Sequence, residues 1–187
     1  MINNDVLVGR TVRRATLADL ESIMELERAG FDPAEQWAAA AWTAELTGDD
    51  RRVVVAETGD QVASDQMADD HELGDQVTDA RIVGVITVQV LVPESDLLRV
   101  VVAADQRRRG IAGELIDAAV GLAAADGARW MMLEVRYDND AAIACYGRAG
   151  FEQLTTRDDY YGPGSHALIM KRYELAAEAA RGAGQAS

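Results

Sequence analysis

The chain has 187 residues, of which 49% are hydrophobic and 27% charged, a composition typical of one soluble globular domain. Its 18 basic and 32 acidic residues leave a net charge of -14, which argues against a nucleic-acid-binding surface. A single cysteine, Cys145, excludes a disulfide framework, and two histidines leave few ligands for a metal, so we expect no metal site. No apolar run approaches the roughly 18 residues that span a bilayer, and the first residues do not resemble a secretory signal. We therefore expect a cytoplasmic protein that does not bind membranes.

The first half of the chain predicts an alternation of helices with strands. Thr16, followed three residues later by Asp19, resembles a short capping box at the start of a helix. Two β-rich runs meet at Pro93 through so short a connection that they must form an antiparallel hairpin. The expected elements are a strand at 11–15, a helix from Thr16, a helix at 33–46 and strands at 53–56, 81–92 and 97–103.

An acidic insert, at about residues 58–80, separates two of these strands. Eight carboxylates and no basic residue lie between Glu57 and Ala80, so this stretch supplies more than half of the net charge. It contains few large apolar residues and can hardly bury a face. We interpret it as a solvated loop; the alternative is an electrostatic attraction for a basic partner.

The second half predicts a strand–helix–strand crossover and then two closing strands. The run at 130–135 is nearly continuously apolar, which is typical of a strand covered on both faces. The expected elements are a helix from Gly110 to about Asp126, strands at 130–135, 151–155 and 167–172, and a helix at 139–149. Together they indicate an α+β domain over residues 1–173, one mixed sheet with helices on both faces, followed by a flexible tail at 174–187.

The turn before Gly110 has the features of an anion site. A strand ends, three consecutive arginines follow, and a helix then begins at a glycine. The first amides of a helix lack partners within it, and the helix dipole makes this end positive. Glycine allows a phosphate to approach the backbone closely. Three arginines oppose the helix dipole, and such a local conflict favours a binding role over a purely structural one.

Two motifs resemble the Gcn5-related N-acetyltransferases, the GNAT superfamily. Arg107, Gly110 and Ala112 match the pattern [RQ]-x-x-G-x-[GA] of the acetyl-CoA pyrophosphate loop in that superfamily. The segment LEVR at 133–136, together with the residues that follow it up to Phe151, resembles the corresponding block of RimI-type ribosomal-protein-alanine N-acetyltransferases. The later sequence RDDYY at 157–161 resembles that subfamily's R-x-x-Y-Y loop. The resemblance implies the GNAT acyl-CoA N-acyltransferase fold.

The resemblance also implies acetyl-CoA as co-substrate and a set of residues that bind it. Backbone groups of the strand before the turn are expected to pair with the pantetheine arm, as an added strand would. The turn and the helix start are expected to hold the pyrophosphate, and an asparagine to bind the pantetheine or pyrophosphate. The expected cofactor-binding residues are Val100, Val101, Val102, Arg107, Arg108, Arg109, Gly110, Ile111, Ala112, Gly113 and Asn139.

Acetyl transfer to an amine needs a base for the ammonium and a proton or hydrogen-bond donor for the leaving thiolate. Glu134 lies in an apolar run, where a charge is costly without a partner or a cleft. Two roles are open for Glu134: a general base, which the resemblance favours, or one partner of a structural ion pair with Arg136. Tyr146 is a core tyrosine or, by the resemblance, the catalytic acid. Because its ordinary pKa lies ~1.5 units above that of a thiol, we expect it to donate a hydrogen bond.

The resemblance implies a protein N-terminus as the acceptor, that of an alanine in a small-subunit ribosomal protein. Two alternatives stay open, a GNAT acetyltransferase for a small amine and a non-catalytic acetyl-CoA-binding module. The acceptor groove is expected between the segment 31–42 and the Tyr160–Tyr161 loop. The sequence does not distinguish a groove open to a peptide from one closed over a small molecule.

Overall fold

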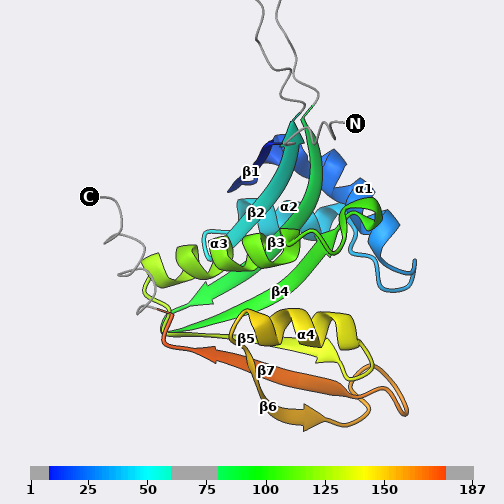
Figure 1. The fold of residues 1–187 in the computed structure, drawn as a ribbon, viewed down its shortest axis with the longest axis vertical. Coiled ribbons are helices and arrows are strands. Elements are labelled where there is room, and N and C mark those ends of the chain that lie inside the picture. Colours follow the sequence, from blue (N-terminus) through cyan, green and yellow to red (C-terminus); the bar gives the residue numbers. More distant parts are fainter. Residues whose placement is uncertain (1–8, 60–79, 176–187) are drawn as a thin grey trace, which may run out of the picture.

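A computed structural model describes residues 9–59 and 80–175 (Figure 1). Residues 60–79 of the acidic insert and nearly all of the expected tail lie outside the described residues. The elements are β1 (Gly9–Arg14), α1 (Leu20–Gly30), α2 (Ala39–Thr47), β2 (Arg51–Gly59), β3 (Arg81–Leu91), β4 (Glu94–Val102), α3 (Ile111–Ala125), β5 (Trp130–Arg136), α4 (Asp140–Arg148), β6 (Glu152–Arg157) and β7 (Ala167–Tyr173), with 3-10 turns at Leu17–Asp19 and Ala104–Gln106. This order is the predicted one.

Seven strands form one mixed sheet in the order β1-β2-β3-β4-β5-β7-β6. Every neighbouring pair is antiparallel except β4 and β5, which are parallel. The predicted hairpin is the β3–β4 pair, and the predicted crossover through α3 joins β4 to β5. The α+β class with one mixed sheet is thereby confirmed.

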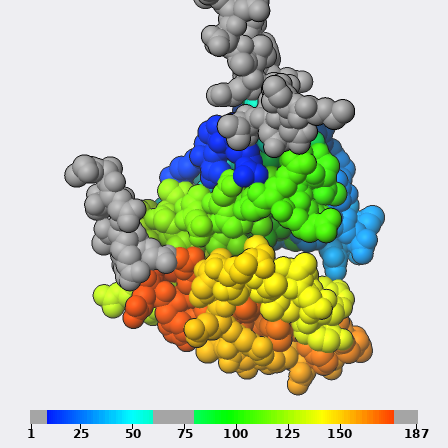
Figure 2. Space-filling view, viewed as in Figure 1, coloured from blue at the N-terminus to red at the C-terminus, as the bar shows by residue number. Residues whose placement is uncertain are grey.

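The parallel pair is short, and this opens the sheet. Residues 94–97 of β4 pair with residues 130–133 of β5, and the pairing stops there. The rest of β4 stays bonded to β3 only, and the rest of β5 to β7 only. The two halves of the sheet therefore diverge from this point. In Figure 1, β3 and β4 lie above, and β5, β7 and β6 lie below them, and Figure 2 shows the same division on the surface.

The two faces of the sheet are covered by different helices. A Cβ at Gly84 of β3 would lie 2.9 Å from Leu115, so the glycine lets α3 approach the sheet closely. Val102, the partner of Gly84 in the register, shares this face, and Val101 points to the other one. There a Cβ at Gly30 of α1 would lie 2.7 Å from the Val101 side chain. Helix α3 therefore packs on one face and α1 on the other.

Two local predictions are wrong. Helix α2 begins at Ala39, whereas a helix was expected from Pro33. Strand β5 is not covered on both faces, because Met131, Leu133 and Val135 are buried while Glu134 is exposed. The diverging sheet leaves the second face of β5 partly uncovered beyond its last pair with β4.

The first helix and the end of the domain show smaller differences. The Thr16 amide donates to Asp19 Oδ2 at 2.7 Å, as a capping box requires, but the first turn is 3-10 and α1 starts at Leu20. Leu175 is buried and its amide donates to the Arg129 carbonyl at 3.1 Å, so packing extends past residue 173. Within the described ranges no helix is long and apolar enough to cross a membrane.

Candidate active site

The open edge of β4 offers unpaired backbone groups. The Ala103 amide donates to the Val83 carbonyl of β3 at 2.9 Å. Because backbone groups alternate along a strand, those of Val101 also face β3, and those of Val100 and Val102 face the opening. The Val102 carbonyl accepts from Arg107 Nε at 3.2 Å. An extended ligand would thus find both groups of Val100 and the amide of Val102.

The turn after β4 ends in a helix terminus directed outward. Arg108 and Gly110 have positive φ values of 62° and 85°, and Gly110 is the N-cap of α3. The amides of residues 111–113 have no acceptor among the described residues, which is the expected state of a helix start. Arg107, Arg108 and Arg109 are exposed around them. Free amides, a helix dipole and three cations are the features with which a helix terminus can hold a phosphate group.

Gly110 is required by the backbone and not by packing. A Cβ there would meet nothing closer than Glu114 Oε1 at 3.9 Å, so the space outside the turn is open. A fourth arginine supports the turn, although no motif in the sequence indicates it. Arg10 of β1 donates to the Arg109 carbonyl at 3.1 Å and pairs with Glu114 at 2.7 Å.

Glu134 lies on β5 just past the point where β4 and β5 separate. Its carboxylate accepts from Arg157 Nη1 at 2.6 Å and keeps a third of its surface exposed. Hydrogen bonding to Glu134 raises the pKa of the Tyr160 hydroxyl. The alternative ion pair of Glu134 with Arg136 is wrong, because Arg136 turns instead to Asp138 at 3.2 Å.

Tyr146 is buried in α4, where its ring packs edge-on against the Phe151 ring with the two ring centroids 5.9 Å apart. Burial raises the pKa of the Tyr146 hydroxyl well above its usual value, so the group stays protonated at neutral pH. Among the described residues the hydroxyl has no hydrogen-bond partner. A protonated, unpaired phenol suits hydrogen bonding to a thiolate better than full proton transfer.

Asn139 has a structural role in addition to its expected contact with the cofactor. It is the N-cap of α4, and its Oδ1 accepts from the Ala142 amide at 3.1 Å. Capping uses the oxygen of the side-chain amide and leaves the nitrogen as a donor. The expected contact with acetyl-CoA would therefore come from Nδ2.

The segment 31–38 and the loop between β6 and β7 both reach the face of β5 that carries Glu134. Glu35 approaches Arg136 at 3.5 Å, and the Arg136 guanidinium lies 5.9 Å from the Tyr161 ring. Arg157 stacks on the ring of Tyr160 at 4.6 Å. These contacts bring the two expected walls of the acceptor groove close to Arg136 and Glu134 on β5.

Two charged residues of β4 were missed in the sequence. Arg99 interrupts an otherwise apolar run at 97–103, and that interruption was the available signal, whereas Asp96 follows Glu94 and Ser95 directly before the run. Burial, followed by the charges of Glu94 and Glu134, raises the pKa of the Asp96 carboxyl. Arg99 binds the wholly buried carboxylate of Glu27 in α1.

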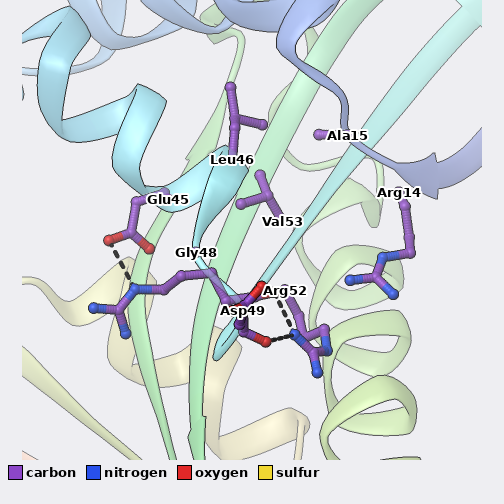
Figure 3. A pocket seen from close by; sticks show the side chains of 9 residues that line it. Arg14, Ala15, Glu45, Leu46, Gly48, Asp49, Arg52 and Val53 are labelled. Atoms are coloured by element: carbon purple, nitrogen blue, oxygen red, sulfur yellow. Dashed lines mark hydrogen bonds and ion pairs between the residues drawn. The ribbon is translucent and has the colours of Figure 1, made fainter.

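A separate polar pocket of about 240 Å³ lies where β1 and α2 end and β2 begins (Figure 3). Arg14, Glu45, Asp49, Arg51 and Arg52 contribute its charged lining. Arg51 Nε lies 3.2 Å from Glu45 Oε1. Figure 3 shows Arg52 beside Asp49, whose carbonyl accepts from Arg52 Nη1 at 2.8 Å. The lining contains none of the expected site residues, so this pocket is not the candidate active site. No cluster of metal-ligating side chains occurs in the part of the chain that the structure describes.

Residues 20–151 match the family model "Acetyltransferase (GNAT) family", and the chain belongs to this family. It is 30% identical over 176 residues to an uncharacterized protein of Mycobacterium leprae, covering 91% of this chain and 41% of that protein. It is 35% identical over 83 residues to the [ribosomal protein bS18]-alanine N-acetyltransferase of Salmonella typhimurium, covering 44% of this chain and 56% of that protein. The chain thus spans about half the length of these relatives.

Among solved structures, the ribosomal-protein-S18-alanine N-acetyltransferase of Escherichia coli is similar, with a TM-score of 0.68 and 22% identity. The match covers 89% of this chain and 94% of the Escherichia coli chain. At this identity the similarity shows a shared fold.

Proposed function

We propose that the protein transfers the acetyl group of acetyl-CoA to the α-amino group of a protein N-terminus. The observation that supports this most is the opening between β4 and β5. Unpaired backbone groups and a helix terminus lie on its β4 side, and a partly exposed carboxylate lies on its β5 side. A strand-like phosphorylated donor and an amine acceptor can therefore meet there.

The donor side fits acetyl-CoA. The backbone of Val100 and Val102 would pair with the pantetheine arm, and residues 107–113 would hold the pyrophosphate. Bound acetyl-CoA supplies a thioester whose carbonyl an amine can attack. An amide on the open edge of β4 would donate to the oxyanion that develops on that carbonyl.

The acceptor side needs a neutral amine. Glu134 would take the proton of the ammonium group, directly or through a water, and Arg157 would hold its carboxylate in place. Tyr146 would donate a hydrogen bond to the departing thiolate. Direct attack in a ternary complex uses each of these groups once and needs no nucleophile from the protein.

The N-terminal alanine of a small-subunit ribosomal protein is the acceptor that we propose. The Salmonella relative carries that specificity in its name, and its similarity covers 83 residues. A small amine is the second candidate acceptor, because Arg136 contacts both expected walls of the groove, Glu35 at 3.5 Å and the Tyr161 ring at 5.9 Å.

The rate of thiol release from acetyl-CoA, measured with three acceptors, tests this function. One is a peptide that starts with alanine, the second is the same peptide with a blocked N-terminus, and the third is a polyamine. We expect release with the free peptide alone. Release with the polyamine alone would support the small-amine acceptor and contradict the proposal.

A further inference from the structure

Arg99 and Glu27 form a buried pair behind the groove. The Glu27 side chain is wholly buried in α1, and the Arg99 side chain on β4 is 11% exposed. Arg99 Nη2 donates to Glu27 Oε1 at 2.6 Å, and its Nε donates to Oε2 at 3.1 Å. Both carboxylate oxygens are thus bonded to one planar guanidinium, a geometry that lysine cannot reproduce.

The same two side chains hold the segment 31–38. Glu27 Oε1 accepts from the Trp37 amide at 2.7 Å, and Arg99 Nη2 donates to the Glu35 carbonyl at 2.6 Å. The Arg99 guanidinium also lies 3.7 Å from the Phe31 ring and 4.7 Å from the Trp37 ring. Because the Trp37 amide and the Glu35 carbonyl are bonded to these side chains, the segment does not form the first turns of the helix predicted at 33–46.

The segment 31–38 reaches β5, the strand that carries Glu134. Glu35, whose carbonyl Arg99 binds, directs its carboxylate to Arg136 of β5 at 3.5 Å. Arg136 lies two residues after Glu134 on the same face of the strand. Arg99 is therefore linked by a hydrogen bond to Glu35, and Glu35 is linked by an ion pair to Arg136 of β5.

We propose that Arg99 is a positioning residue for the acceptor: it fixes the segment 31–38 as one wall of the acceptor groove. This inference rests on the proposed function for the identity of the acceptor. Arg99 does not itself touch the reacting atoms. Its loss should weaken acceptor binding and leave acetyl-CoA binding intact. The groups expected to bind acetyl-CoA are backbone groups on the open edge of β4 and at the start of α3, whereas the Arg99 side chain packs against α1.

The test compares Arg99→Lys with Arg52→Lys. Arg52 is also a largely buried arginine paired with a carboxylate, Asp126, but it lies away from the groove. We expect Arg99→Lys to raise the acceptor KM about tenfold or more, with kcat and the acetyl-CoA Kd changing less than about twofold. Hydrogen exchange at residues 31–38 should quicken in this variant alone. Arg52→Lys should leave the acceptor KM and this exchange unchanged.

A double variant covers the case in which Arg99→Lys does not fold. Arg99→Met with Glu27→Gln removes both charges together and leaves no unpaired buried ion, yet it also removes the bond to the Glu35 carbonyl. It should show the same rise in acceptor KM. An unchanged acceptor KM in either folded variant, or equal losses of acceptor and acetyl-CoA binding, would overturn the proposal.

The exchange measurement separates this inference from the proposed function. If the parent protein acetylates no peptide, the proposed function fails. The acceptor KM is then measured with whichever amine the parent acetylates. Unchanged exchange at residues 31–38 in Arg99→Lys would refute the role of Arg99 whatever the acceptor is.

Discussion

Glu134→Gln separates catalysis from stability, because the structure predicts very different sizes for the two effects. The variant keeps the shape of the side chain and removes its charge. Glu134 and Arg157 are 33% and 55% exposed, and an ion pair that is open to water contributes about 0–1 kcal/mol. The melting temperature should therefore fall by no more than about 4 °C. Losing a general base should lower turnover by ~10²–10⁴-fold.

The pH dependence of this defect identifies its cause. A peptide α-amino group has a pKa of about 7.7–8.0, so a base is needed below that range and is dispensable above it. The ratio of kcat/KM between parent and variant, measured from pH 6 to 9, should therefore shrink as pH rises. Asp126→Asn, which removes a carboxylate paired with Arg52 away from the groove, is the control and should keep full turnover. A defect that is constant with pH and accompanied by a large loss of thermal stability would refute a catalytic role for Glu134.

Three further variants test the donor site, the acid and the buried carboxyl. Gly110→Asp should abolish acetyl-CoA binding in equilibrium dialysis and cost about 1–2 kcal/mol of stability because residue 110 has a positive φ. The control Gly121→Ala, in open space on the same helix, should gain about 0.5–1 kcal/mol of stability. Unimpaired acetyl-CoA binding in Gly110→Asp would place the cofactor elsewhere. Tyr146→Phe should lower kcat and leave acetyl-CoA binding nearly intact, and equal losses of both would indicate a packing role. Burial raises the pKa of Asp96, so its ionisation weakens the fold as pH rises through that pKa. Asp96→Asn should therefore melt higher than the parent at pH 7 and at the same temperature near pH 3, and a variant that melts lower at pH 7 would contradict the pKa direction.

The order of elements could be predicted because it depends on local patterns. Helical periodicity and β-rich runs are properties of neighbouring residues, and the hairpin at Pro93 followed from its length alone. The segment 31–38 could not be predicted, because Glu27 and the distant Arg99 bind its backbone groups. An apolar run likewise does not indicate whether other elements cover both faces of the strand. In β5, one face is partly uncovered beyond residue 133.

The site divides in the same way. The turn around Gly110 is a local feature, so its sequence was enough to predict free amides at the start of α3. The partner of Glu134 could not be predicted in this way, since Arg157 lies 23 residues away on a strand that pairs with β7 and not with β5. Arg10 reaches the turn from β1, 99 residues earlier, and nothing near it in the sequence indicates that contact.

The position of the acetyl group on a peptide tests the central claim most directly. The peptide begins with a free alanine and contains one internal lysine, and the product formed with acetyl-CoA is fragmented by mass spectrometry. The account predicts acetylation of the alanine α-amino group and an unmodified lysine, with product formation greatly reduced in Glu134→Gln. Acetylation of the lysine alone, or no peptide product under conditions in which a small amine is acetylated, would contradict it.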